Sequence, residues 1–219
     1  MIQKILRPFI LFFILYGSNN LWSQDTIVNS SAYEVFDHMV GHTNTGIFDG
    51  IEYFEKFPVR NDKYKFFKSS DFEKGSLIYD GNPFLNIELK YDVYDGNLLI
   101  RNSEVLGSPV TQLYKEKISS FYIAKHTFVH LRVATNKDEP LQGFFELLIN
   151  DENLKLYKQH RKKMIKKTDD GVYYEFKDDP RYILYTNESF FKLKNENSML
   201  TIFPEYKEQL KSFIHAIEK

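Results

Sequence analysis

The chain has 219 residues, a formal net charge of −1 and no cysteine. A near-neutral chain lacks the positive excess that nucleic-acid binding needs, and a cysteine-free chain has neither disulfides nor thiolates for metal binding or catalysis. Its 20 Phe and 15 Tyr favour half-buried β-strands, where aromatic side chains pack well.

The N-terminal residues have the layout of an export signal. Lys4 and Arg7 precede the apolar run Phe9–Leu15, and polar residues at 17–20 end it. The run is far shorter than the ~20 residues that cross a bilayer. We expect cleavage after Ser23, which leaves 219 minus 23, or 196, residues with a charge of 27 minus 30, or −3. The mature protein is expected to be periplasmic or secreted, without a membrane span and, lacking cysteine, without a lipid anchor.

Residues 24–219 contain no linker, repeat or low-complexity segment, so we expect one domain. Helical spacing predicts a first helix over 31–42. Strand patterns follow, and short polar turns join most of them. The predicted strands are 51–56, 63–68, 76–79, 87–94, 97–101, 118–133, 143–149, 153–160, 172–177, 181–187 and 189–194.

The clearest strand pattern lies between Gly75 and Ser103. Apolar residues from Ile87 onward alternate with polar ones, which predicts a strand with one wet face that includes Asp92. Asp80-Gly81 and Asp95-Gly96 predict two-residue hairpin turns, because both turn positions must tolerate positive φ.

The chain ends with a helical pattern over 204–218. Pro204 suits the first helical position, and an apolar stripe runs from Tyr206 to Ile217. We expect this amphipathic helix to pack on the sheet. The predicted fold class is therefore mainly β: an antiparallel meander forming a sandwich or barrel-like sheet, with a C-terminal amphipathic helix and an N-terminal signal helix.

Three stretches, Gly75–Gly81, Asn86–Asp95 and Phe203–Ile214, resemble a group of exported, functionally uncharacterised Bacteroidetes proteins. The resemblance covers roughly residues 48–215. It implies an envelope location and an all-β fold. Its motifs are turn and core signatures, so it supplies no active residues.

Two histidine pairs have a spacing of four. His38 and His42, with Glu34 before them, would share a helix face, but Gly41 weakens the helix and a solvated polar face is favoured over a metal site. His126 and His130 lie in a predicted strand, where four residues span ~13 Å, too far for one metal ion. We expect no metal at this pair. The candidate ligand-binding face consists of Tyr122, His126, Phe128 and His130.

Two charged groups remain. Asp80, Asp92 and Asp95 could serve acid–base work or calcium binding, but turn and surface roles are favoured. The basic run 160–167 could contact phosphates of an acidic partner, or could be a lysine-protected edge strand, and the second interpretation is favoured. Its candidate anion-binding residues are Arg161, Lys162, Lys163, Lys166 and Lys167.

The sequence contains no phosphate loop, nucleophile elbow or dinucleotide fingerprint, and we expect no cofactor. The favoured hypothesis is a non-catalytic envelope protein that binds a partner or a small apolar ligand. A periplasmic hydrolase that uses His and Asp groups on the sheet is the first alternative. A structural interaction module is the second.

Overall fold

The computed structural model describes residues 46–60, 62–102, 105–133, 140–194 and 196–209. The predicted export signal, the helix over 31–42, the His38–His42 pair and the end of the C-terminal helix lie outside the described residues.

The strands are β1 (Ile51–Glu52), β2 (Glu73–Tyr79), β3 (Asn82–Asp92), β4 (Asn97–Arg101), β5 (Thr111–Gln112), β6 (Ile118–Ile123), β7 (His126–Val133), β8 (Leu141–Asn150), β9 (Leu154–Gln159), β10 (Lys162–Lys167), β11 (Tyr173–Asp178), β12 (Arg181–Thr186) and β13 (Ser189–Leu193).

The strands form one 11-stranded antiparallel sheet and one two-stranded sheet. The large sheet has the order β1-β5-β4-β3-β2-β6-β7-β8-β9-β12-β13, and the small one pairs β10 with β11. Most neighbours in the large sheet are also neighbours in sequence, which is the meander that the sequence predicts. The mainly β, antiparallel fold class is confirmed.

The first part of the large sheet curls around an aromatic core. The ring of Tyr91 in β3 lies 5.2 Å from Phe121 in β6 and 5.2 Å from Phe128 in β7. In a flat sheet, β3 and β7 would be three strand spacings, or ~14 Å, apart. Their ring contact therefore requires strong curvature, which makes this part barrel-like rather than one layer of a sandwich. Gly75 permits a close approach here, since a Cβ at this position would lie 2.2 Å from the Tyr122 carbonyl oxygen.

A second apolar cluster lies further along the sheet. It is built on Val133, Leu141, Phe145, Tyr157 and Ile183. Phe145 and its neighbour Phe144 are both buried, yet they belong to different clusters. Because successive side chains of a strand point to opposite faces, β8 carries one cluster on each face. This explains why its sequence is apolar on both sides.

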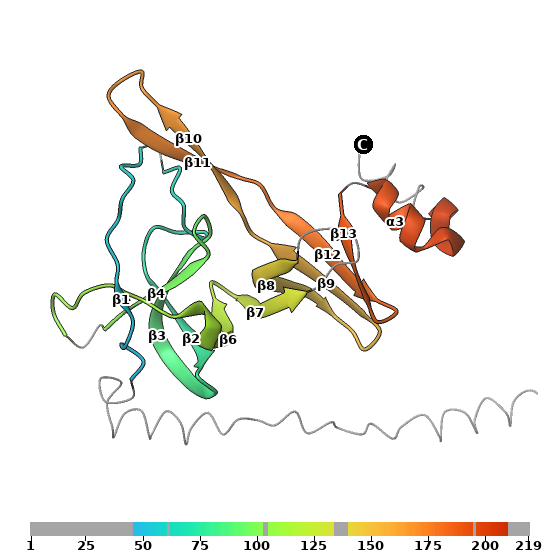
Figure 1. Cartoon of the computed structure of the whole chain (residues 1–219), viewed down its shortest axis with the longest axis horizontal. Helices are drawn as coiled ribbons and strands as arrows, with labels where there is room; N and C mark the ends of the chain where they lie inside the picture. Colours follow the sequence, from blue (N-terminus) through green and yellow to red (C-terminus); the bar gives the residue numbers. More distant parts are fainter. Residues whose placement is uncertain (1–45, 61, 103–104, 134–139, 195, 210–219) are drawn as a thin grey trace, which may run out of the picture. The chain divides into compact units, whose positions relative to one another are not determined.

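Strands β9 to β12 form one long hairpin with a kink. Gln159 pairs with Arg181, and three residues further along each strand Lys162 pairs with Asp178. The register is therefore continuous, although β9 and β12 belong to the large sheet and β10 and β11 do not. The strands break at residues 160–161 and 179–180, where Pro180 has no backbone N–H to donate. Figure 1 shows β10 and β11 leaving the large sheet beyond this point.

The predicted strands 51–56 and 63–68 are wrong for most of their length. Only Ile51–Glu52 pairs as a strand, and residues 62–68 run irregularly across the sheet with one bridge from Phe66 to Asp92. The predicted strand 118–133 is two strands, because Ala124 and Lys125 adopt φ values of 51° and 67° and form a tight turn.

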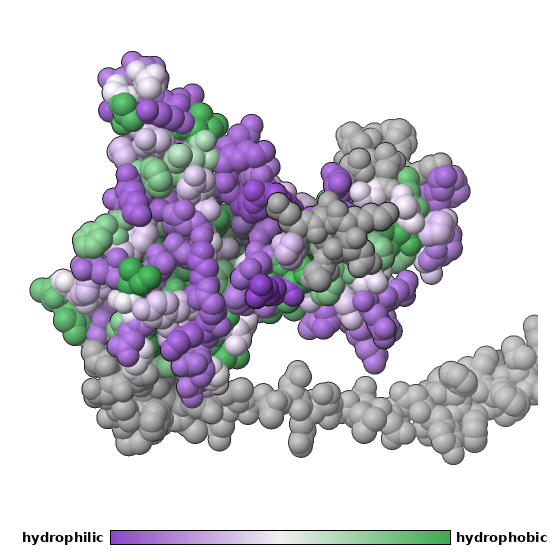
Figure 2. All heavy atoms as spheres, viewed as in Figure 1, coloured by the Kyte–Doolittle hydropathy of each residue, from purple (hydrophilic) through white to green (hydrophobic). Residues whose placement is uncertain are grey.

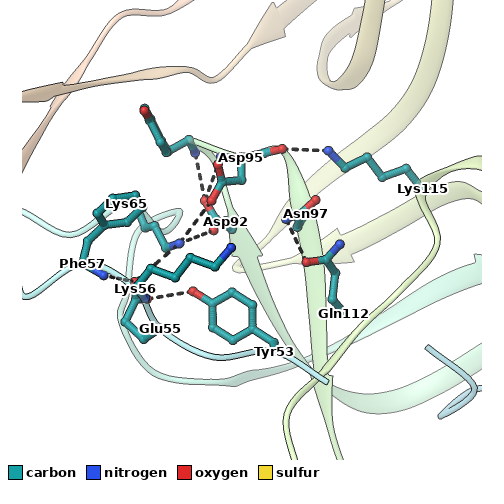
Figure 3. A network of polar contacts seen from close by, with 11 residues as sticks. Tyr53, Glu55, Lys56, Phe57, Lys65, Asp92, Asp95, Asn97, Gln112 and Lys115 are labelled. Atoms are coloured by element: carbon teal, nitrogen blue, oxygen red, sulfur yellow. Dashed lines mark hydrogen bonds and ion pairs between the residues drawn. The ribbon is translucent and has the colours of Figure 1, made fainter. Parts of the chain in front are cut away.

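A buried ion pair fixes the irregular segment to the sheet (Figure 3). Lys65 Nζ lies 2.8 Å from Asp92 Oδ2, and both side chains are almost fully buried. Asp95 and Glu55 approach the same ammonium at 3.3 and 3.5 Å. Burial lowers the pKa of Lys65, but its hydrogen bonds to Asp92 and Tyr53 outweigh that effect and raise it above its ordinary value. The ammonium therefore stays charged inside the protein.

This ion pair corrects two predictions about the β3–β4 turn. Asp92 faces the interior rather than solvent, because Lys65 neutralises it there. Its other oxygen accepts hydrogen bonds from the backbone N–H groups of Tyr94 and Asp95. The turn therefore has four residues, 93–96, between the paired Asp92 and Asn97, instead of the two-residue turn predicted at 95–96. The two-residue turn at Asp80-Gly81 is confirmed, with φ values of 51° and 79°.

The C-terminal helical region begins earlier than predicted. Helix α3 covers Glu196–Ile202, and a 3-10 turn at Pro204–Tyr206 follows it. Residues 207–209 are helical again, so Pro204 begins a second helical stretch, as expected, and not the first one.

We predict that Lys65→Met destabilises the protein by about 3–5 kcal/mol, because it leaves the buried Asp92 carboxylate without its counter-ion. The free energy of unfolding is measured by chemical denaturation. The double variant Lys65→Met/Asp92→Asn should recover much of the loss, since Asn keeps the oxygen that accepts from the turn. Lys74→Met, on an exposed side chain of β2, is the control. A loss below about 1 kcal/mol for Lys65→Met would contradict the prediction.

Candidate functional site

A buried glutamate between two histidines forms the main polar cluster on the sheet. Glu146 lies in the middle of β8 and is 6% exposed. One carboxylate oxygen accepts a hydrogen bond from His126 Nδ1, and the other accepts one from His160 Nε2 at 2.6 Å. Both oxygens of a buried carboxylate thus have donors, which a carboxylate inside a protein requires.

The strand register brings the three residues together. Glu146 pairs with Phe128 of β7 on one side and with Lys158 of β9 on the other. Paired residues share a face, and so do residues two apart in a strand. His126, two before Phe128, and His160, two after Lys158, therefore lie on the same face as Glu146.

The carboxylate also determines which ring nitrogens carry hydrogen. Ionised Glu146 only accepts hydrogen bonds, so His126 Nδ1 and His160 Nε2 are the protonated nitrogens. Both rings pack against Phe67 in a T-shaped arrangement, with centroids 5.2 Å away for His126 and 4.8 Å away for His160. The cluster thus orients two imidazoles beneath the irregular segment 62–68.

The surroundings lower the pKa values of both Glu146 and His160, for different reasons. Burial raises the pKa of Glu146, but the hydrogen bonds from His160 and His126 outweigh it and hold this pKa below its ordinary value of 4.5. Burial lowers the pKa of His160 below 6.5 by more than the hydrogen bond to Glu146 raises it. At neutral pH the cluster therefore contains an ionised Glu146 and a neutral His160.

A cleft of about 500 Å³ opens beside His160, at the kink of the long hairpin. We call it the first cleft. Its walls come from the segment 62–68 on one side and from the kink at 158–162 and 176–180 on the other. Five lysine and arginine side chains line it together with His160, against two carboxylates, Asp62 and Asp178. The basic residues are Lys63, Lys68, Lys158, Arg161 and Lys162.

These five cations differ in how they are held. Lys63 forms an ion pair with Glu175 at 3.0 Å, and Lys162 donates to the carbonyl oxygens of Tyr64 and Phe66. Within the part of the chain that the structure describes, neither Lys68 nor Lys158 forms an ion pair with a carboxylate. Each instead lies near an aromatic ring, at 5.9 and 5.8 Å from the ring centroid.

Two residues that line the first cleft have a left-handed backbone. Asp62 has φ 53° and Lys68 has φ 58°. Side chains with a Cβ adopt this conformation at a cost, which the surrounding structure must offset. Lys68 is held by a hydrogen bond from the Tyr64 hydroxyl to its carbonyl oxygen, at 2.7 Å. The wall of the cleft is therefore specified by tertiary contacts and not by local propensity.

The predicted ligand-binding face forms only in part. Phe128 is fully buried in the core, and His130 packs on Phe144 at 5.1 Å between ring centroids. His126 binds Glu146. Tyr122 pairs with Thr127 and so points to the opposite face, where it is 45% exposed. Tyr122 does not belong to that face. Its cross-strand partner, Thr127, lies between His126 and Phe128 in β7 and so points to the other side of the sheet.

The basic run 160–167 divides between the cleft and an edge strand. Arg161 and Lys162 line the first cleft. Lys163, Lys166 and Lys167 lie on β10, whose one partner among the described strands is β11. The lysine-protected edge strand that the sequence favours is therefore present. Figure 2 shows hydrophilic and hydrophobic residues mixed over this hairpin, where Met164 and Ile165 are among the exposed apolar residues.

The three aspartates that the hydrolase alternative names each lie beside a lysine. Asp92 and Asp95 contact Lys65, and Asp80 pairs with Lys117 at 3.2 Å. Within the described ranges no group of three or more His, Cys, Asp or Glu side chains is arranged so that it could hold a metal ion, and the contacts of His126 and His160 with Glu146 are hydrogen bonds. No helix in these ranges is both long enough and apolar enough to cross a membrane.

Sequence reasoning missed Glu146, Lys158 and Lys68, and it considered His160 only as part of the basic run 160–167. Glu146 had a usable signal, since an acidic residue between Phe145 and Leu147 in a strand that is apolar on both faces needs a buried partner. The sequence contains no comparable signal for Lys68, because only the three-dimensional course of the segment 62–68 brings this residue to the cleft.

Comparison with known proteins gives no significant match to a family model, to a curated protein or to a solved structure. The site is therefore interpreted from its own geometry.

We predict that acidification from pH 6.5 downward destabilises the protein through His160. Its pKa is lower in the folded than in the unfolded state, so its contribution is fully present above 6.5 and is lost as the pH falls. Glu146, whose pKa is also lowered, adds a second loss below 4.5. His160→Gln keeps a donor for Glu146 but does not titrate. Thermal unfolding across this pH range should show a shallower decline for His160→Gln than for the wild type. Equal slopes for His160→Gln and wild type would contradict the assignment.

Proposed function

We propose that the chain is an exported, non-catalytic binding protein that holds an anionic group of its ligand in the first cleft. The observation that carries this proposal is the charge of the cleft, whose lining has five Lys and Arg side chains against two carboxylates. The whole chain has a formal charge of −1, so this positive excess is local. A concave site with low-dielectric walls strengthens the attraction for anions.

Lys68, Lys158 and Arg161 are the residues that we propose contact the anion. Lys68 and Lys158 have no carboxylate partner among the described residues, and Arg161 lies 3.6 Å from Asp179, which is longer than a direct hydrogen bond. Lys162 already donates hydrogen bonds to two backbone carbonyl groups. It therefore adds to the positive potential of the cleft and is not among the residues that we propose contact the anion.

The geometry favours an anionic over a small apolar ligand. Phe128, the apolar residue of the predicted face, is 0% exposed, and the aromatic core around it is filled by the rings of Phe121, Phe144 and Tyr91. The first cleft, by contrast, is open and charged. A binding role is retained from the sequence hypothesis, with a changed ligand class.

The export part of the proposal rests on the N-terminal pattern. The positive residues, the short apolar run and the polar break before Ser23 support secretion to the periplasm or beyond. The absence of cysteine is consistent with a chain that needs no redox maturation.

We predict that Lys68→Asn/Lys158→Gln lowers the affinity for inorganic phosphate and for glucuronate by about tenfold or more, because it removes two charge-assisted hydrogen-bond donors. Asn tolerates the left-handed backbone of Lys68. Affinity is measured by NMR titration at low and high salt, and added salt should weaken wild-type binding.

The matched control is Lys125→Asn/Lys166→Gln. Lys125 is exposed and has a left-handed backbone like Lys68, and Lys166 is exposed on a strand outside the cleft. This control should bind like the wild type. The proposal fails if wild-type protein binds neither anion, or if both double variants weaken binding equally.

A further inference from the structure

The hairpin of β10 and β11 has one open edge. Within the described ranges, the one strand that pairs with β10 is β11. The outer edge of β11 is already contacted by the chain itself, since the N–H of Tyr174 donates to the Pro58 carbonyl oxygen and that of Phe176 to the Lys63 carbonyl oxygen, both at 2.9 Å. The outer edge of β10 is therefore the edge of this hairpin that is left for another strand.

The register shows which backbone groups of β10 point away from β11. The N–H of Asp179 donates to the carbonyl oxygen of Arg161 at 2.8 Å, so these opposite residues form a hydrogen-bonded pair. In an antiparallel ladder such pairs alternate with pairs whose N–H and C=O groups point outward. The outward groups of β10 are therefore those of Lys162, Met164 and Lys166. The same alternation accounts for the two outward N–H groups of β11.

The side chains beside this edge combine positive charge with apolar surface. Of the four lysines in β10, Lys163 pairs with Asp179 at 2.9 Å, whereas Lys166 and Lys167 form no ion pair with a carboxylate among the described residues. The two apolar residues between these lysines are 37% and 39% exposed. Unpaired backbone groups, uncompensated charge and exposed apolar side chains thus lie along one strand.

Charge determines which strand can occupy the edge. A second copy of β10 would bring its lysines beside those of the first, and like charges on paired strands are destabilising. An extended segment with acidic side chains would instead place carboxylates beside Lys166 and Lys167. In such edge pairing the main chain supplies affinity and alternate side chains supply specificity. Lysines that protect the edge against self-association therefore select an acidic partner.

We infer that β10 is a docking edge for an acidic, extended segment of a partner protein, which adds to the hairpin as a third strand. The residues from Lys163 to Lys167 line neither the first cleft nor a second cleft, of about 530 Å³, at β12 and β13. The docking edge is therefore a separate site, and the inference does not rest on the proposed function.

The probe is a ten-residue peptide in which Glu alternates with Val, and its control has Lys in place of Glu. Hydrogen exchange of the protein amides is followed by NMR with and without peptide. In the free protein the amides of Met164 and Lys166 should exchange quickly and that of Ile165, which faces β11, slowly. The Glu peptide should slow exchange at Met164 and Lys166 by about tenfold or more, and salt should weaken this effect. The Lys peptide should leave both amides unchanged.

The variant Met164→Pro removes the outward N–H at the centre of the edge. It leaves the hydrogen bonds between β10 and β11 in place, because a strand tolerates proline where its N–H faces solvent. Met164→Pro should weaken peptide binding by about tenfold or more, whereas Met164→Val, which keeps the N–H, should bind like the wild type. Thermal unfolding, and phosphate binding in the first cleft, should be the same for both variants.

A second variant tests the charge without changing the backbone. Lys166→Gln/Lys167→Gln should weaken binding of the Glu peptide by about fivefold or more. Its matched control is Lys74→Gln/Lys125→Asn, which removes two exposed lysines outside β10 and should leave binding unchanged.

Five results would overturn the inference. Slow exchange at Met164 and Lys166 in the free protein means that the chain itself covers the edge. Protection that grows with protein concentration, without peptide, assigns the edge to a second copy. Failure of the Glu peptide to bind, or equal binding of the Glu and Lys peptides, removes the acidic partner. Undiminished binding by both Met164→Pro and Lys166→Gln/Lys167→Gln places the peptide elsewhere. Protection by vesicles containing anionic phospholipid, but not by the peptide, replaces the partner class. Phosphate binding in the first cleft is measured independently, so these results leave the proposed function standing.

Discussion

The ion pair between Lys65 and Asp92 is the contact on which the rest of the site depends. Both groups are buried, so each is tolerable only while the other is present and charged. The pair fixes a segment that has almost no strand pairing of its own. Phe67 then lies against His126 and His160, and Lys68 lies at the cleft. One buried charge pair thus determines the position of a whole wall.

The opposite wall depends on backbone register. The long hairpin keeps its pairing through the kink, so Lys158, His160 and Lys162 stay on one face while the strands leave the large sheet. Glu146 holds His160 at the point where the strand breaks. The cleft therefore lies between a wall fixed by electrostatics and a wall fixed by hydrogen bonding and Pro180.

Much of the fold follows from local patterns in the sequence. The alternation from Ile87 to Tyr91, the Asp80-Gly81 turn and the turn-bounded strands after residue 141 all predict the observed meander. Local patterns failed where a distant residue changed the outcome. Asp92 looks like a surface residue until Lys65 is placed beside it, and Ala124-Lys125 adopts a turn conformation that neither residue favours alone. The cleft could not be predicted, because its cations lie at 63, 68 and 158–162 and only the fold brings them together.

The continuous register of the kinked hairpin also limits which insertions and deletions the strands β9 to β12 can tolerate. Inserting or deleting one residue at 160–161 would turn every side chain beyond it to the opposite face, because side chains alternate along a strand. A matching change at 179–180 on the partner strand would restore the pairing but not the faces, whereas a change of two residues on each strand would restore both. The tip of the hairpin is free of this restriction. Related chains are therefore expected to vary in hairpin length through compensated pairs of insertions and to vary freely at residues 168–172.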